Sequence, residues 1–145
     1  MKVFLASDHA GFELKGKLIA HLKSRGYEVK DYGPLALNPT DDYPETILPL
    51  AHGIALERGA MGIAIGMSGT GEAIVCNRVK GVRAAEYYGG AQEILTLSRQ
   101  HNNANVLALA ARFVGEKEAI AAVELWLATP FSNEERHARR VQELG

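Results

Sequence analysis

A glycine-rich segment has the residue types for acid-base chemistry on a bound anion. It runs Gly66-Met67-Ser68-Gly69-Thr70-Gly71, and Glu72 follows at once. Backbone amides in such an arch can surround a developing oxyanion, and a carboxylate beside them could remove a proton next to a carbonyl. We therefore expect Glu72 to be a general base. The alternative is a solvated glutamate, favoured in a first helical turn by the helix dipole alone.

Two effects compete at Glu72 if it is the base. A helix N-terminus stabilises a carboxylate and makes it a weaker base. Burial has the opposite effect and raises the pKa of a carboxyl group. The hypothesis therefore requires that Glu72 is buried beneath a ligand.

Familiar glycine-loop templates do not fit the segment. A nucleotide P-loop would continue with Lys and Ser or Thr, where this chain has Glu72 and Ala73. A dinucleotide fingerprint would need a third glycine where Ile74 stands. The nucleophile elbow of serine hydrolases nearly matches with Ser68, but Thr70 replaces its last glycine. A hydrolase that uses Ser68 stays open as an alternative.

Other polar residues flank the expected strands at both ends. Asp8, His9 and Arg112 follow strands, and the carboxyl ends of parallel strands are where ligands bind. His101 and Asn102 instead precede a strand, which places them at the opposite edge. If they are functional rather than surface residues, a second copy of the chain must bring them to the site.

Basic residues are concentrated near the C-terminus. Arg136 and Arg140 share one face of an expected helix, and His137 lies beside them. Forked guanidinium groups suit a phosphate dianion. The alternative is a solvated basic face that pairs with Glu134 and Glu135.

The elements that must position these residues alternate between strand and helix. Short apolar runs predict strands at 3–6, 61–65, 82–85 and 105–110, and residues 27–32 can supply one more. Helical spacing of apolar residues predicts helices at about 14–25, 44–57, 91–98 and 117–128, with another that passes through 74–77. This alternation predicts an α/β fold, a three-layer Rossmann-like sandwich around a five-stranded parallel sheet.

The last predicted helix, residues 133–144, is polar, and only Val141 and Leu144 are available for burial. We expect it to pack on a partner subunit. The 145 residues otherwise suit a single domain over 1–145.

Composition excludes several classes of protein. The 16 Lys and Arg against 17 Asp and Glu give a net charge of −1, so no basic field favours nucleic acid. The single cysteine, Cys76, can form neither an internal disulfide nor a multi-thiolate metal site, and it suits a reducing cytoplasm. No stretch has the roughly 20 apolar residues of a membrane span. We expect a cytoplasmic protein with no metal.

Several segments together resemble the ribose-5-phosphate isomerase B family, which includes galactose-6-phosphate isomerase. The segments occur in family order along nearly the whole chain. They are Ser7-Asp8-His9-Ala10-Gly11, Asp42-Tyr43-Pro44, Gly66 to Glu72, Asn77, Ser98 to Asn102, Ala111-Arg112 and Arg136 to Arg140.

The resemblance implies a homodimer, sometimes paired into tetramers, that needs no cofactor. It implies interconversion of ribose 5-phosphate and ribulose 5-phosphate through an enediolate. Glu72 would move the proton, and His101 would open the sugar ring, contributed with Asn102 across the dimer interface. Further substrate contacts would come from Asp8, His9, Met67, Ser68, Gly69, Thr70, Gly71, Arg112, Arg136, His137 and Arg140.

Within the family the sequence resembles the branch with serine at position 68 and glutamate at 72, rather than the branch with a cysteine base. The stretch Glu86 to Gly90 differs from familiar members. A tetrose or hexose phosphate is therefore an alternative substrate. A sugar-phosphate-binding module without turnover is the non-enzymatic alternative.

Overall fold

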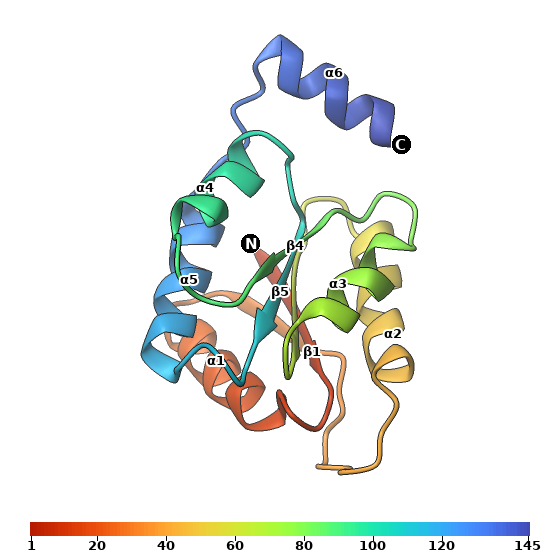
Figure 1. Cartoon of the computed structure of the whole chain (residues 1–145), viewed down its shortest axis with the longest axis vertical. Helices are drawn as coiled ribbons and strands as arrows, with labels where there is room; N and C mark the ends of the chain where they lie inside the picture. Colours follow the sequence, from red (N-terminus) through yellow and green to blue (C-terminus); the bar gives the residue numbers. More distant parts are fainter.

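Five parallel strands form the centre of the structure, a computed structural model that describes residues 1–145. The sheet order is β2-β1-β3-β5-β4 (Figure 1). The strands are β1 (Lys2–Ser7), β2 (Glu28–Asp31), β3 (Met61–Gly66), β4 (Ala84–Tyr87) and β5 (Val106–Ala110). Full burial of β3 and β5 explains why these segments are continuous apolar runs. The predicted α/β fold class is confirmed.

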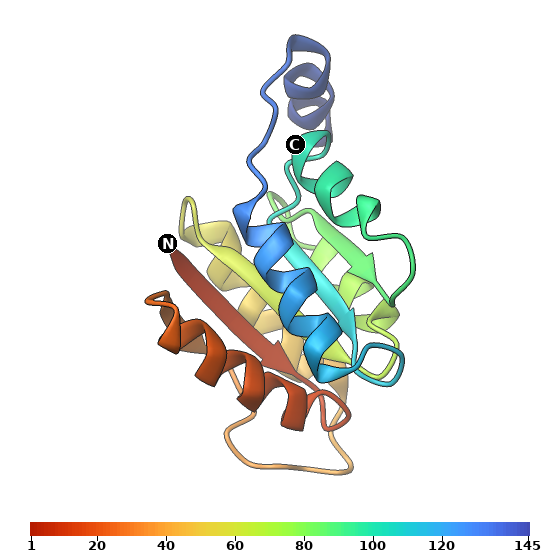
Figure 2. The same cartoon turned by 90° about the vertical axis from the view of Figure 1, so that its left-hand side faces the viewer.

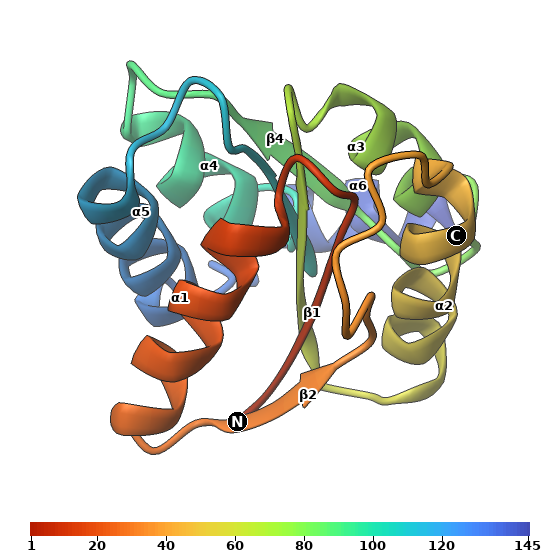
Figure 3. The same cartoon turned by 90° about the horizontal axis from the view of Figure 1, so that it is seen from below.

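Helices cover both faces of the sheet. They are α1 (Phe12–Ser24), α2 (Tyr43–Leu56), α3 (Thr70–Asn77), α4 (Glu93–Gln100), α5 (Glu116–Ala128) and α6 (Glu135–Leu144). Figure 3 shows α1, α4 and α5 on one side of the sheet and α2 and α3 on the other. Each side has its own hydrophobic core, one around Trp126 and Leu18 and the other around Ile47 and Leu50. None of these helices combines the length and the apolar character that a membrane span requires.

Parallel pairing gives the sheet two chemically different edges. All strand carboxyl ends lie at the lower edge in Figure 1, where the loops into α1, α3 and α5 begin. The C-terminal helix α6 lies beyond the opposite edge and protrudes from the domain in both Figure 1 and Figure 2. Its one buried residue is His137. Most of α6 is therefore not packed against its own chain.

One predicted strand is displaced along the sequence. The apolar pattern predicts residues 82–85, whereas β4 pairs with β5 over Ala84–Tyr87. Arg83 lies in the preceding loop, where its backbone N–H donates to Asn105 Oδ1 at 2.7 Å. The strand therefore continues through the polar residue Glu86. This shift decides what Glu86 contacts.

Candidate active site

Glu72 lies in the first turn of α3 with only 3% of its surface exposed. Its carboxyl group occupies the space above Gly66, where a Cβ atom would overlap both carboxylate oxygens. Any side chain at position 66 would therefore displace Glu72. The burial that the sequence argument required is present.

The surroundings of Glu72 favour its protonated form. Burial is the main cause that raises the pKa of Glu72 to about 7. Its own backbone N–H opposes the shift, whereas a hydrogen bond with Asp8 and the negative charges of Asp8 and Glu86 add to it. A carboxyl group with this pKa can both accept and return a proton near neutral pH.

Asp8 is held beside Glu72 by the ends of two adjacent strands. Its backbone N–H donates to the carbonyl oxygen of Ile65 at 3.1 Å, which joins the end of β1 to the end of β3. The Gly11 N–H donates to Asp8 Oδ1 at 3.0 Å, so the carboxylate is fixed and only 8% of the residue is exposed. The predicted meeting of Asp8 and Glu72 at one edge is confirmed.

The glycine loop presents free donors beside these carboxyl groups. The backbone N–H groups of Met67, Ser68, Gly69 and Gly71 donate to no protein acceptor, whereas that of Thr70 donates to Ser68 Oγ at 3.3 Å. Gly69 adopts φ of +80°, a left-handed conformation that glycine tolerates best. The loop can therefore offer several amides to an anion.

The structure does not support the hydrolase alternative. Ser68 Oγ accepts the Thr70 N–H, and no histidine hydrogen bonds to it. An unactivated serine hydroxyl is a weak nucleophile. Cys76 is fully buried, and burial raises the pKa of its thiol to about 12. Glu72 is the remaining candidate for the base.

Cationic groups lie at the same edge. His9 Nδ1 shares a 2.7 Å hydrogen bond with Asp41 Oδ1, and this bond raises the pKa of His9. The guanidinium of Arg112 lies against the sulfur of Met67 at 3.7 Å. Both side chains are well placed to attract an anion. We call these residues the carboxyl-edge cluster: Asp8, His9, residues 66–71, Glu72 and Arg112.

The remaining predicted residues gather at the opposite edge. This amino-edge cluster comprises His101, Asn102, Arg136, His137 and Arg140. In one chain it is separated from Glu72 by the length of β5, five residues at about 3.3 Å each. The structure therefore does not bring His101 to Glu72 within one copy.

His137 is the predicted phosphate ligand with the least freedom. Its ring stacks on that of His101 with the centroids 4.2 Å apart, and its Nδ1 shares a 2.8 Å hydrogen bond with Ser132 Oγ. The residue is 3% exposed. Burial and the proximity of His101 lower the pKa of His137. Its role as a phosphate ligand stays a prediction, and its contacts suit support of His101 better.

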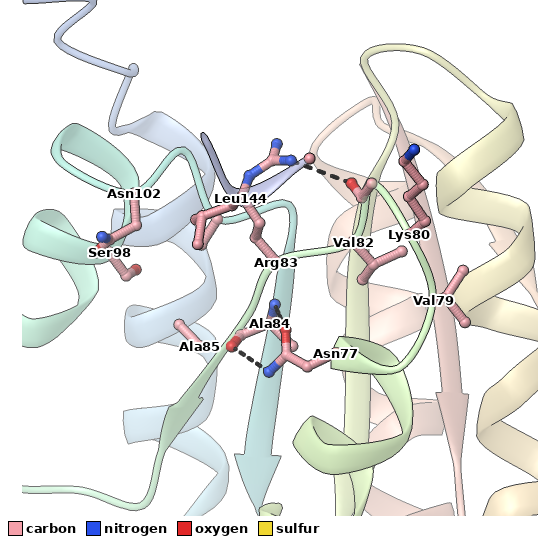
Figure 4. A pocket seen from close by; sticks show the side chains of 13 residues that line it. Asn77, Val79, Lys80, Val82, Arg83, Ala84, Ala85, Ser98, Asn102 and Leu144 are labelled. Carbon is pink, nitrogen blue, oxygen red and sulfur yellow. Dashed lines mark hydrogen bonds between the residues drawn. The ribbon is translucent and has the colours of Figure 1, made fainter. Parts of the chain in front are cut away.

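A cavity of about 420 Å³ lies near the amino-edge cluster (Figure 4). Arg83, Asn102 and Leu144 line it, and the side chain of Asn77 bonds both backbone polar groups of Ala84 below it. Glu72 does not line this cavity. No group of three or more His, Cys, Asp or Glu side chains is arranged to hold a metal ion.

Sequence reasoning missed three contributors to the carboxyl edge. Asp41 orients His9, and the ring of Tyr43 packs where a Cβ on Gly71 would lie, 2.8 Å from the nearest ring atoms. Glu86 accepts the Thr70 hydroxyl at 2.6 Å. Two signals were available: Tyr43 stands in the segment Asp42-Tyr43-Pro44 that matches the family, and Glu86 begins the unusual stretch.

Comparison with known proteins supports the same interpretation. The family described as Ribose/Galactose Isomerase matches residues 3–144. The chain belongs to this family. Ribose-5-phosphate isomerase B of Mycobacterium tuberculosis H37Rv is 40% identical over 144 residues, 99% of this chain and 88% of that protein. The protein of the same name in Escherichia coli K12 is 38% identical and covers 99% of this chain and 93% of its own length.

Solved structures of this family superimpose closely on the chain. Ribose-5-phosphate isomerase B from Mycoplasma genitalium, crystallised with bound ribulose-5-phosphate, has a TM-score of 0.93 at 38% identity, covering 99% of this chain and 93% of that one. The Clostridium thermocellum protein has a TM-score of 0.93 at 40% identity, with 100% and 95% covered. The predicted family and its class of enzyme, the sugar-phosphate isomerases, are confirmed.

Proposed function

We propose that the chain interconverts ribose 5-phosphate and ribulose 5-phosphate through an enediolate, with Glu72 as the base. The observation that carries the proposal is a buried carboxyl group with a pKa of about 7 beside a loop of free amides. The names of the relatives and the ribulose-5-phosphate bound to the Mycoplasma genitalium protein support the choice of substrate.

Glu72, the amides of the glycine loop and Asp8 each have a role in this reaction. The Glu72 carboxylate takes the proton from C2 of open-chain ribose 5-phosphate, and the free amides hold the oxygen that becomes negative. Protonated Glu72 then returns a proton to C1. Ribulose 5-phosphate results once the hydroxyl proton has moved from the oxygen on C2 to the oxygen on C1. Asp8 binds substrate hydroxyls.

A second copy of the chain completes this site. His101, the acid that opens the sugar ring, and Asn102 lie at the opposite edge from Glu72 in the same chain. The protruding α6 carries Arg136 and Arg140, both exposed. Arg136 Nε pairs with Glu134 at 3.5 Å, an exposed contact that is weak enough to be replaced by a phosphate on another subunit. We therefore propose a homodimer with sites at its interface. Pairing of dimers into tetramers and a cytoplasmic location belong to the same proposal.

The phosphate would be bound from both sides of that interface. His9 and Arg112 belong to the carboxyl edge, and Arg136 and Arg140 come from the partner subunit with His137 behind them. Several cations around one dianion form charge-assisted hydrogen bonds, which are among the stronger ones in proteins. These contacts fix the phosphate end of the substrate. Selectivity for the number of carbon atoms must therefore come from contacts with the other end.

A panel of four-, five- and six-carbon sugar phosphates assayed in D2O tests the function. We expect aldose-ketose conversion, fastest for the pentose pair, with deuterium incorporated at C1 of ribulose 5-phosphate. Faster conversion of a tetrose or hexose phosphate would contradict the substrate but keep the reaction. Tight binding without conversion or deuterium incorporation would show a binding module and overturn the proposal.

A further inference from the structure

Glu86 contacts the glycine loop from a neighbouring strand. It lies in β4, and Thr70 Oγ1 donates to its Oε1 at 2.6 Å. The adjacent residue, Tyr87, points to the other face of the sheet and donates to Glu118 at 3.0 Å. Two carboxylates therefore accept hydroxyl protons on opposite faces near β4. Only that of Glu86 is at the site.

The hydrogen bond to Glu86 determines what Thr70 can offer a ligand. A threonine hydroxyl has one proton to donate, and here Glu86 receives it. The hydroxyl therefore presents lone pairs alone and cannot donate to the enediolate. Stabilisation of that anion falls to the backbone amides. The same bond ties the first residue of α3, and with it the turn that carries Glu72, to β4.

The charged groups around Glu72 come from several elements. Asp8 at the end of β1 and Glu86 in β4 both contribute negative charge, and the Cys76 thiol follows one turn later in α3. From α2, Tyr43 packs on Gly71. The cations at this edge have other contacts: His9 binds Asp41, and Arg112 lies against Met67. The charges that act on the base are thus acidic.

We propose that Glu86 is a positioning residue for the base: its carboxylate fixes Thr70 at the start of α3 and adds its negative charge, with a smaller effect, to that of Asp8 near Glu72. The inference rests on the proposed function, because Glu72 is the base whose behaviour it explains. It adds a residue of β4 to a site otherwise built from β1, β3 and β5. The charge of Glu86 favours a protonated Glu72 and hence a stronger base.

Two substitutions separate the hydrogen bond from the charge. Glu86→Gln keeps an oxygen that accepts the Thr70 hydroxyl but removes the charge. We expect the acid limb of the pH profile of kcat/KM to shift down by roughly half a unit, with KM unchanged. Glu86→Ala removes both, so the same shift should accompany a loss of kcat of roughly tenfold as Thr70 is released. Glu118→Gln, the matched change on the other face, should alter neither.

Direct titration of Glu72 makes the test independent of turnover. The carboxyl carbon of Glu72, labelled with 13C and assigned with Glu72→Gln, can be followed by NMR in the native protein and in Glu86→Gln. A lower midpoint in the variant supports the proposal even if the native protein isomerises none of the sugars tested. An unchanged midpoint overturns it. A variant whose KM rises while the acid limb stays in place would show a substrate contact instead, and would also overturn it.

Discussion

The two edges of the sheet, which we propose to be two halves of one site, are built differently. At the carboxyl edge, Glu72 and Asp8 are 3% and 8% exposed and are fixed by strand ends, a tight loop and backbone hydrogen bonds. At the amino edge, the Arg136 side chain is 61% exposed on a helix that buries only His137. One copy of the fold thus fixes the proposed base, whereas His101 and the arginines of α6 lie at the opposite edge and would act on the site of a second copy in the proposed dimer.

This difference in burial between the two edges predicts different kinetic effects of substitution. Burial adjusts the pKa of Glu72 before substrate binds, so the loss of Glu72 should lower kcat. The ion pair of Arg136 on α6 with Glu134 is exposed and weak enough for phosphate to replace it, so changes there should act mainly on KM. Substitutions at the two edges can therefore test whether effects on kcat and on KM separate in this way.

The largest effect is expected from Glu72→Gln. The amide has nearly the same shape but cannot take a proton, so kcat should fall at least about a hundredfold, the lower end of general-base effects. Substrate affinity, measured by calorimetry, should stay close to that of the native protein. Near-normal turnover would refute Glu72 as the base.

A smaller effect is expected at the other edge from Arg136→Ala. Loss of a charge-assisted bond to phosphate should raise KM by roughly 10- to 100-fold while kcat changes little. Arg139→Ala is the matched control, because Arg139 lies on the same helix and has an equivalent exposed ion pair, with Glu135 at 3.4 Å as Arg136 has with Glu134 at 3.5 Å. An unchanged KM in Arg136→Ala, or an equal rise in both variants, would contradict a specific phosphate contact.

The mildest perturbation is a change of pH. A base with a pKa of about 7 is ionised above that value and protonated below it, so kcat/KM should be flat above neutrality and fall about tenfold per unit on the acid side. Initial rates measured in a series of buffers at different pH values give the midpoint of this acid limb. An acid limb near pH 4.5, the ordinary range of a glutamate, would show that the burial of Glu72 does not persist in the working enzyme.

Much of the fold and of the carboxyl edge was predictable from sequence. The buried strands β1, β3 and β5 are continuous apolar runs and fall close to the expected positions, and the mostly exposed β2 lies within the expected range 27–32. Strand ends then bring Asp8, residues 66–72 and Arg112 to one edge without knowledge of any side-chain contact. The requirement that Glu72 be buried also followed, because its proposed chemistry conflicts with a helix N-terminus.

Contacts between distant polar side chains could not be predicted in the same way. The Thr70–Glu86 and His9–Asp41 bonds join residues with no shared periodicity, and the polar Glu86 masked the true extent of β4. The sequence likewise indicates that His137 is one member of a basic helix face, whereas in the structure it is buried and stacks on His101. Such pairs depend on where the loops and α6 come to lie.

Complementation between two inactive variants tests most directly whether the two edges form one site across a dimer. Glu72→Gln and His101→Asn chains with different affinity tags are co-expressed, and only the mixed dimers are purified. One of the two sites in each mixed dimer then has both native residues, so turnover should recover to about half that of the native dimer. Activity no higher than that of the two variants alone would contradict a site shared between subunits.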